Sequence, residues 1–137
     1  MRMRGAITLT VALALIAFGL KDSFAAEADL PEKPVIVMQL QQAVRANDKA
    51  WLAAHTRYPL SYFGSGKRII RDKAAFIHNY ALLFGAKLRA AILAQDPANV
   101  FENWQGLMVG EGRYNVWVRD ASDGGASHYQ IVAINGS

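Results

Sequence analysis

Apolar residues recur at helical spacing in the part of the chain that follows the first 34 residues. Over Val35–Ala46 they lie three or four positions apart, and the positions between them are mostly glutamine. This spacing is typical of a helix with one apolar face. Asn47-Asp48 ends the pattern and provides an N-cap for a second, short helix over Lys49–His55.

A longer apolar stripe follows over Lys73–Gln95, with Asp72 placed as its N-cap. Gly85 lies inside the stripe and costs about 1 kcal/mol relative to alanine within a helix. The pattern therefore predicts either one long helix or two helices in succession. Asp96-Pro97 ends the helical region, because the residue before a proline is disfavoured in helical backbone.

Two segments between the helical regions have strand character instead. Tyr58–Phe63 is aromatic, contains Pro59 and is too short for a helix, and a glycine turn separates it from Lys67–Ile70. This arrangement predicts a hairpin. A proline in a sheet is found on an edge strand or at the first residue of a strand. Pro59 therefore predicts that this strand either lies at a sheet edge or begins at the proline.

The last third of the chain is also strand-like. Phe101–Asp120 contains two short apolar runs, Gly106–Gly110 and Tyr114–Arg119, on either side of a Gly-Glu-Gly turn. A loop of turn residues over Ala121–Ala126 precedes a final strand, Ser127–Asn135. Helices followed by antiparallel strands predict an α+β domain.

Alternation along the last two strands assigns their side chains to two faces. One face is expected to hold Tyr114, Val116 and Val118, and the other Asn115, Trp117 and Arg119. In the final strand Tyr129, Ile131 and Ala133 are expected to lie opposite His128, Gln130, Val132 and Ile134. Both faces are rather apolar, so we expect the helices to cover one face and a twofold partner to cover the other.

The first 34 residues form no part of this pattern. A basic head precedes sixteen uncharged residues, Gly5–Leu20, and Ser23-Phe24-Ala25 offers a small-x-Ala cleavage site. These features predict a signal peptide over residues 1–25, with Ala28 as a second cleavage point. An uncleaved anchor is the alternative, although the run is short for a membrane span. Residues 26–34 are then a flexible leader, and residues 35–137 form a single domain.

Charge and cysteine content narrow the function classes. The whole chain has a net charge of +4, but residues 26–137 contain twelve basic and ten acidic residues, for a net charge of +2. Such a balance gives no reason to expect nucleic acid or, after cleavage, a membrane as partner. There is no cysteine, which excludes disulfides, thiolate nucleophiles and cysteine-based metal sites. An exported domain without disulfides suits the bacterial periplasm.

The order of elements resembles the nuclear transport factor 2-like superfamily, which has a cystatin-like α+β fold. The segments that are similar are Asn47-Asp48 with Tyr58–Leu60, the helix with Asp72, Phe76 and Tyr80, and the strands from Asn103 to Trp117. The resemblance implies a cone-shaped domain, with N-terminal helices packed in the concave side of a curved antiparallel sheet. It also implies a conical cavity at the open end of the sheet.

Aromatic residues are numerous for so small a domain, and some of them are expected to line such a cavity. The residues expected there are Trp51, Tyr58, Tyr62, Tyr80, Trp104, Tyr114 and Arg119. A cavity of this kind would suit an apolar or ring-shaped ligand. Tyrosine and tryptophan are equally typical of protein interfaces, and the sequence does not separate the two uses.

Candidate chemistry is sparse. The ketosteroid isomerase-like branch of the superfamily uses a tyrosine and two acids inside the cone, and this chain does not match that trio. Glu102 is the one acid in an aromatic setting, so it is the candidate acid or base, with a solvated position at a strand start as the favoured alternative. His55, His78 and His128 have no metal-ligand spacing, and we expect neither metal nor cofactor.

The sequence thus favours an exported binding or interaction domain, with an apolar ligand or a protein partner of the immunity or inhibitor type. A homodimer through the outer sheet face is a further expectation. The alternative is a small isomerase- or dehydratase-like enzyme that uses Glu102 with Tyr58 or Tyr62.

Overall fold

The computed structural model describes residues 32–121 and 128–136, so the expected signal peptide lies outside the described residues. The helices are α2 (Glu32–Ala46), α3 (Lys49–Ala54), α4 (Lys73–His78), α5 (Tyr80–Leu83) and α6 (Ala86–Ala94). The strands are β1 (Thr56–Phe63), β2 (Lys67–Ile70), β3 (Phe101–Asn103), β4 (Gly106–Glu111), β5 (Tyr114–Asp120) and β6 (Tyr129–Gly136). The α+β class is confirmed. The turn expected at Ala121–Ala126 lies almost wholly outside the described ranges.

The helix starts follow local capping chemistry. Asp48 caps α3, where its Oδ1 accepts the Trp51 N–H at 3.0 Å, and Asp72 caps α4 in the same way. Both caps are as predicted. The helix α2 begins at Glu32, earlier than expected, and Pro34 lies in its first turn. Proline is tolerated there because the first N–H groups of a helix have no partner within it, so the end of the expected leader is helical.

The long apolar stripe after Asp72 forms three helices instead of one or two. The break at Gly85, which precedes α6, was predicted, whereas the break at Asn79 was not. The Asn79 side chain and backbone N–H both donate to the Ala75 carbonyl, which closes α4. A short polar side chain that competes for backbone partners favours such an ending.

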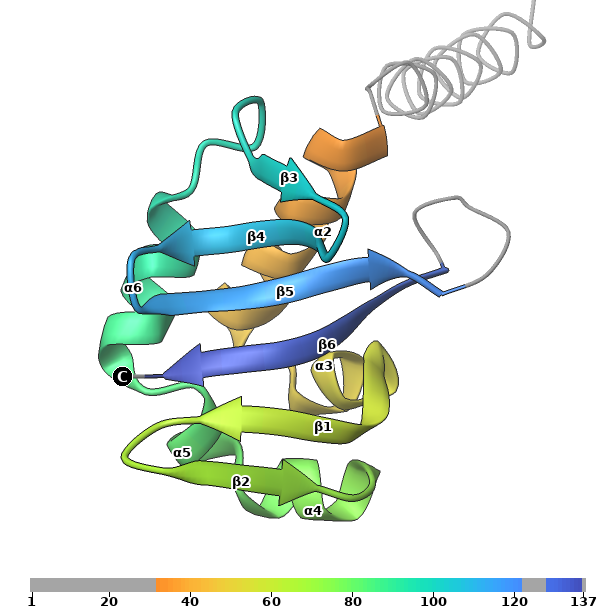
Figure 1. The fold of residues 1–137 in the computed structure, drawn as a ribbon, viewed down its shortest axis with the longest axis vertical. Helices are drawn as coiled ribbons and strands as arrows, with labels where there is room; N and C mark the ends of the chain where they lie inside the picture. Colours follow the sequence, from red (N-terminus) through yellow and green to blue (C-terminus); the bar gives the residue numbers. More distant parts are fainter. Residues whose placement is uncertain (1–31, 122–127, 137) are drawn as a thin grey trace, which may run out of the picture. The chain divides into compact units, whose positions relative to one another are not determined.

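The strands form one curved, open sheet in the order β2-β1-β6-β5-β4-β3 (Figure 1). Four pairings are antiparallel, but β1 and β6 are parallel. The expectation of a purely antiparallel sheet is therefore wrong. The chain leaves β2, crosses through α4–α6 to the far edge, and returns through three hairpins, which brings β6 beside β1 in the same direction. Hairpin signals define only neighbours in sequence, so they do not reveal this pairing.

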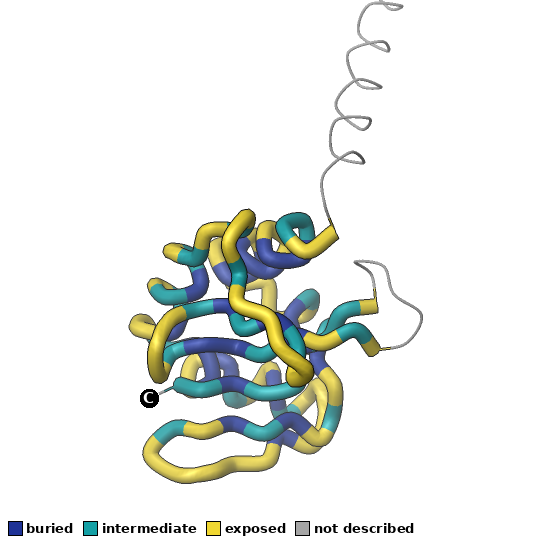
Figure 2. The backbone as a smooth tube through the Cα atoms, turned by 45° about the horizontal axis from the view of Figure 1, so that its top comes forward, coloured by how far each residue is buried: buried dark blue, intermediate teal, exposed yellow. Residues whose placement is uncertain are grey.

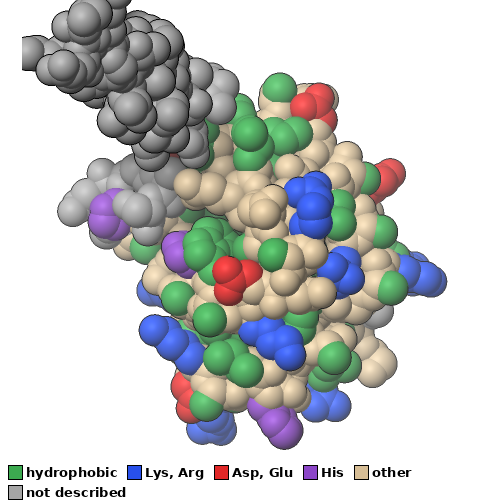
Figure 3. Space-filling model, turned by 180° about the vertical axis from the view of Figure 1, so that it is seen from behind, with side chains coloured by type: hydrophobic (Ala, Val, Ile, Leu, Met, Phe, Trp, Pro, Cys, Tyr) green, Lys and Arg blue, Asp and Glu red, His purple; other side chains and the backbone are tan. Residues whose placement is uncertain are grey.

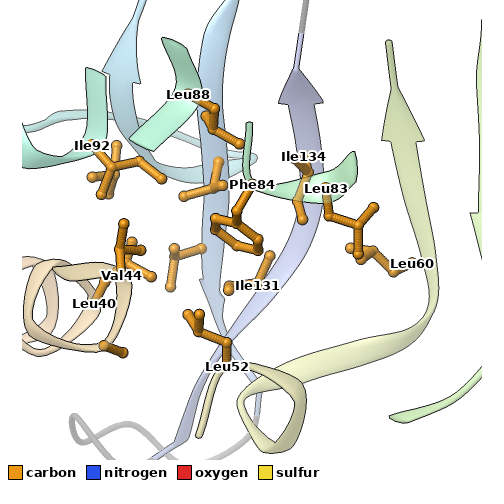
Figure 4. Packing of buried hydrophobic residues seen from close by; sticks show 14 of the residues in the cluster. Leu40, Val44, Leu52, Leu60, Leu83, Phe84, Leu88, Ile92, Ile131 and Ile134 are labelled. Atoms are coloured by element: carbon orange, nitrogen blue, oxygen red, sulfur yellow. The ribbon is translucent and has the colours of Figure 1, made fainter. Parts of the chain in front are cut away.

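The helices lie on one face of the sheet, and the strands lie in front of them in Figure 1. Apolar side chains from α2, α3, α6 and the strands fill the space between the two layers, among them Leu40, Leu52, Leu88 and Ile131 (Figure 4). The edge strands β2 and β3 are mostly exposed, whereas the central strands contain the buried positions (Figure 2). The concave side is thus a packed core.

A bulge interrupts the alternation in β6. Trp117 pairs with Ala133, but the next residue, Val118, pairs with Ile131, so Val132 is the extra residue. Ile131 and Ile134 consequently both face the helices, with exposed fractions of 2% and 0%. Strict alternation placed them on opposite faces, and that prediction is wrong.

Gln41 joins α2 to the end of α6. Its side chain is buried, and its Nε2 donates to the carbonyls of Ile92 and Gln95 at 3.0 and 2.7 Å. Replacing Gln41 by leucine should lower the free energy of unfolding by about 1–3 kcal/mol, because buried carbonyls lose their donor. Urea unfolding measures this, with the exposed neighbour Gln42→Leu as control. An equal loss in both variants would contradict the role of Gln41.

Candidate functional site: the outer face of the sheet

A row of mostly apolar side chains crosses the sheet on the face that the helices leave open. The strand register places Ile69, Ser61, Ala133, Trp117, Met108 and Phe101 side by side across the six strands. We call this set the outer-face row. The alternate positions, such as Ile70, Val116 and Val109, point into the core, so the row is the second apolar face of the sheet.

The outer-face row and its neighbours expose large apolar side chains. Exposed fractions are 47% for Ile69, 55% for Phe101, 41% for Phe63 beside the row and 86% for Trp104 in the β3–β4 turn. Phe101 packs edge-on against Trp117, with ring centroids 6.4 Å apart. On the helix side, by contrast, charged groups of both signs stand among the apolar ones (Figure 3). A contiguous exposed apolar patch of this kind marks an interaction site more often than scattered apolar residues do.

A hollow of about 320 Å³ lies on this face. Its lining is Phe63, Gln105, Trp117, Arg119, Val132, Ala133 and Asn135. The Arg119 Nε donates to the Gln105 carbonyl at 3.2 Å, and Asn135 Nδ2 donates to Asn115 Oδ1 at 2.7 Å. Aromatic, amide and guanidinium groups therefore surround one depression. We call it the outer-face hollow.

The concave side offers much less space. Its cavity measures about 20 Å³ and is lined by residues of α2, α3, β5 and β6: Ile36, Gln39, Leu40, Trp51, His55, Val118, Tyr129 and Ile131. That volume accommodates roughly one water molecule. Within the described residues, the space between helices and sheet is taken up by side chains.

The residues expected to line a pocket are dispersed in the structure. Trp51 borders the small cavity and stacks on His55, with ring centroids 3.8 Å apart. Trp104 is exposed, and Arg119 lies on the opposite side of the sheet, at the outer-face hollow. Tyr114 is half-buried, with Lys87 Nζ 5.8 Å from its ring centroid.

The three other tyrosines donate to groups of the core instead of facing a common space. Tyr58 donates to the Ala53 carbonyl at 2.7 Å, Tyr62 to the Leu82 carbonyl at 3.2 Å, and Tyr80 to Asn47 Oδ1 at 2.9 Å. These bonds join β1 to α3 and α5, and α5 to the end of α2. The tyrosines act here as polar anchors of packing.

Glu102 lies in β3 on the side of the helices and forms an ion pair with Lys33 of α2. The carboxylate is exposed, and this hydrogen bond raises the pKa of Lys33. Tyr129 is close by, and burial raises its pKa, with the charges of Glu32, Asp120 and Glu102 adding to the effect. Sequence reasoning identified Glu102 but not its cation, because Lys33 was expected to lie in a flexible leader.

The histidines are separate from one another. His55 Nδ1 lies 2.8 Å from the Trp51 carbonyl, His78 ends α4, and His128 is exposed immediately before β6. Among residues 32–121 and 128–136, no group of three or more His, Cys, Asp or Glu side chains is placed to hold a metal ion.

Sequence reasoning missed most of the outer-face hollow. It placed Trp117, Arg119 and Val132 on the second face, but it did not connect Phe63, Gln105 or Asn135 with them. The signal was present in the alternation of Tyr58–Phe63, where Phe63 shares parity with the half-buried Ser61. The parallel pairing of β1 with β6, which brings Phe63 opposite Asn135, was the missing step.

The buried tyrosine hydroxyls predict a pH dependence. Burial raises the pKa of Tyr80, and the charge of nearby Arg89 opposes the rise; burial also raises the pKa of Tyr58. The protonated hydroxyls add to the free energy of unfolding. This contribution is complete below the ordinary tyrosine pKa of about 10 and is lost as the pH rises through the higher pKa of the folded state. The urea midpoint should therefore fall as the pH rises above about 10. The variant Tyr58→Phe/Tyr80→Phe should fall less steeply, and an identical slope in both proteins would contradict this.

No family model, no curated protein and no solved structure matches this chain. No helix within the described ranges is both long and apolar enough to cross a membrane.

Proposed function

We propose that this protein is a small exported binding domain that docks a protein partner through the outer face of its sheet. The observation that supports this most strongly is the outer-face row, in which the side chains of Phe101 and Ile69 are exposed. Aromatic residues and arginine dominate the energetic centres of protein interfaces. An immunity or inhibitor role in the periplasm fits a domain of this size.

The element order supports a place in the nuclear transport factor 2-like superfamily, since helices cover one side of a curved six-stranded sheet. The enzyme alternative has less support. Glu102 is ion-paired with Lys33, and the hydroxyls of Tyr58 and Tyr62 donate to backbone carbonyls. A general acid or base needs to lie within hydrogen-bond reach of its substrate in a sheltered site.

Export has a direct test. When the full chain is expressed in a bacterium, we expect the periplasmic fraction to contain a protein that begins at Ala26, or at Asp29 if the second cleavage point is used. Amino-terminal sequencing distinguishes the two. Uncleaved protein in the membrane fraction would support an anchor instead.

The docking surface is tested by photo-crosslinking in cells that express the full chain. A photoreactive amino acid replaces Met108 in the outer-face row or, as matched control, Ile77, which is 43% exposed on α4. We expect a discrete crosslinked product from position 108 and none from position 77. Equal products at both positions, or none at either, would contradict the proposal. Light scattering of the purified protein shows whether the partner is a second copy.

A further inference from the structure

Among the described residues, the charged side chains at the outer-face hollow are cations. Arg119 lines it, and Lys67 lies beside it, with its Nζ 5.7 Å from the Phe63 ring centroid. The acids in the strands have the opposite parity, because Glu102, Glu111 and Asp120 alternate with residues that face outward. In the described part of the chain, the strands therefore place cations but no carboxylates on this face.

The other described acids lie in or next to helices. Asp48 and Asp72 cap α3 and α4, Glu32 is in the first turn of α2, and Asp96 accepts the Ala98 N–H. None of these elements lies on the outer face (Figure 1). Lys67 and Arg119 thus have no carboxylate from the described residues opposite them.

Arg119 is oriented by a backbone contact that leaves most of its donors available. Its Nε donates to the Gln105 carbonyl, and within residues 32–121 and 128–136 its two Nη nitrogens have no hydrogen-bond partner. A guanidinium that presents its Nη groups beside an aromatic wall suits a carboxylate, which accepts charge-assisted hydrogen bonds roughly twice as strong as neutral ones. Trp117 and Phe63 border the same hollow and can receive an apolar side chain.

A second copy of this chain does not complement such a face. A twofold contact through the outer-face hollow would bring together two copies of Lys67 and two of Arg119, with no described acid between them. Like charges that meet across an interface cost several kcal/mol and suppress wrong partners. The charge distribution thus favours a different, acidic partner over a homodimer.

We propose that the outer-face hollow receives an acidic segment of a protein partner, with a carboxylate on Arg119 and an apolar side chain against Trp117 and Phe63. This inference rests on the proposed function of the outer face as a docking surface. It names the chemistry of the partner and excludes a second copy as the main occupant.

Defined peptides test this proposal. The probes are the acetylated, amidated pentapeptide Glu-Leu-Glu-Phe-Glu and its analogue with glutamine at all three Glu positions. They are added to protein purified after expression of the full chain with ¹⁵N-labelled tryptophan. The readout is the shift of the indole N–H signals, which gives a dissociation constant for each peptide. We expect the acidic peptide to bind about ten-fold more tightly at low salt and to lose most of that advantage in about 0.5 M NaCl.

The variant Arg119→Gln should remove the preference for the acidic peptide, whereas Arg45→Gln, on the exposed side of α2, should preserve it. Circular dichroism confirms that both variants are folded. If the glutamine peptide binds equally well, the acidic class of partner is wrong, while a positive crosslink at position 108 still supports the docking surface. If neither peptide shifts the signals, or if the protein is a stable dimer that Arg119→Gln leaves intact, the proposal is overturned.

Discussion

Replacing Gly110 by alanine is expected to lower the free energy of unfolding by about 3 kcal/mol or more, the upper part of the range for a residue in a forbidden backbone conformation. Gly110 lies in β4 with a φ of +128°, where side chains are sterically excluded. A Cβ there would also lie 2.3 Å from the Tyr114 carbonyl oxygen. That oxygen belongs to the backbone of the neighbouring strand, so it cannot rotate away as a side chain could.

The effect should be specific to this position. Gly66, in the β1–β2 turn, has open space where a Cβ would lie and no positive φ, so Gly66→Ala should change stability by about 0.5 kcal/mol or less, as surface substitutions do. Urea unfolding of the two variants beside the parent measures both values. A loss below about 1 kcal/mol for Gly110→Ala would show that β4 can move away from β5, and the close approach would then not be essential.

Local signals predicted those features of the fold that depend on neighbours in sequence. Asp48 and Asp72 were recognised as caps because the chemistry that starts a helix lies within three residues. Gly85 was recognised as a break for a similar reason. The Asn79 break was missed, because an asparagine inside an apolar stripe is compatible with a continuing helix. The helix ends there because the Asn79 side chain donates to the Ala75 carbonyl, and the sequence does not reveal that bond.

The features that position the candidate site depend on long-range pairing. The parallel contact of β1 with β6 joins residues far apart in the chain, and it brings Phe63 to the same hollow as Trp117. Glu102 shows that local sequence also fails to identify an ion-pair partner that is distant in the chain. Its aromatic neighbours in sequence suggested a sheltered acid, but its partner is Lys33, which was assigned to a flexible segment.

The composition of both sheet faces is the link between fold and function here. One apolar face of a sheet is enough to pack a layer of helices, and the residues opposite it are free to be polar. This sheet instead keeps Trp117, Met108 and Phe101 on the outer side, where no helix among the described elements covers them. Stability alone does not require such residues, and this is the reason for the proposal that a partner covers them.

Replacing Ile134 by alanine is expected to have the second large effect, because the bulge at Val132 places Ile134 in the core together with Ile131. With the bulge, Ile131 and Ile134 both point into the core although they are three residues apart. In a strand without a bulge, residues three apart lie on opposite faces, since the side-chain period of a strand is two, and one of the two isoleucines would be exposed. Losing a buried isoleucine from a core costs about 2–5 kcal/mol, and a typical domain has only about 5–15 kcal/mol in total.

Val132→Ala is the matched control for this substitution. It shortens a half-buried side chain in the outer-face hollow but keeps the extra residue, so β6 retains its register and the core is unchanged. Urea unfolding should show a loss of about 2–5 kcal/mol for Ile134→Ala, or failure to obtain folded protein, but about 1 kcal/mol or less for Val132→Ala. If Ile134→Ala were as stable as the control, Ile134 would not belong to the core, and the bulge would not separate an inner from an outer face of β6. The outer-face row requires the opposite result, because Ala133 faces outward next to an isoleucine that faces the core, and the extra residue Val132 places Ile131 on that same inner side.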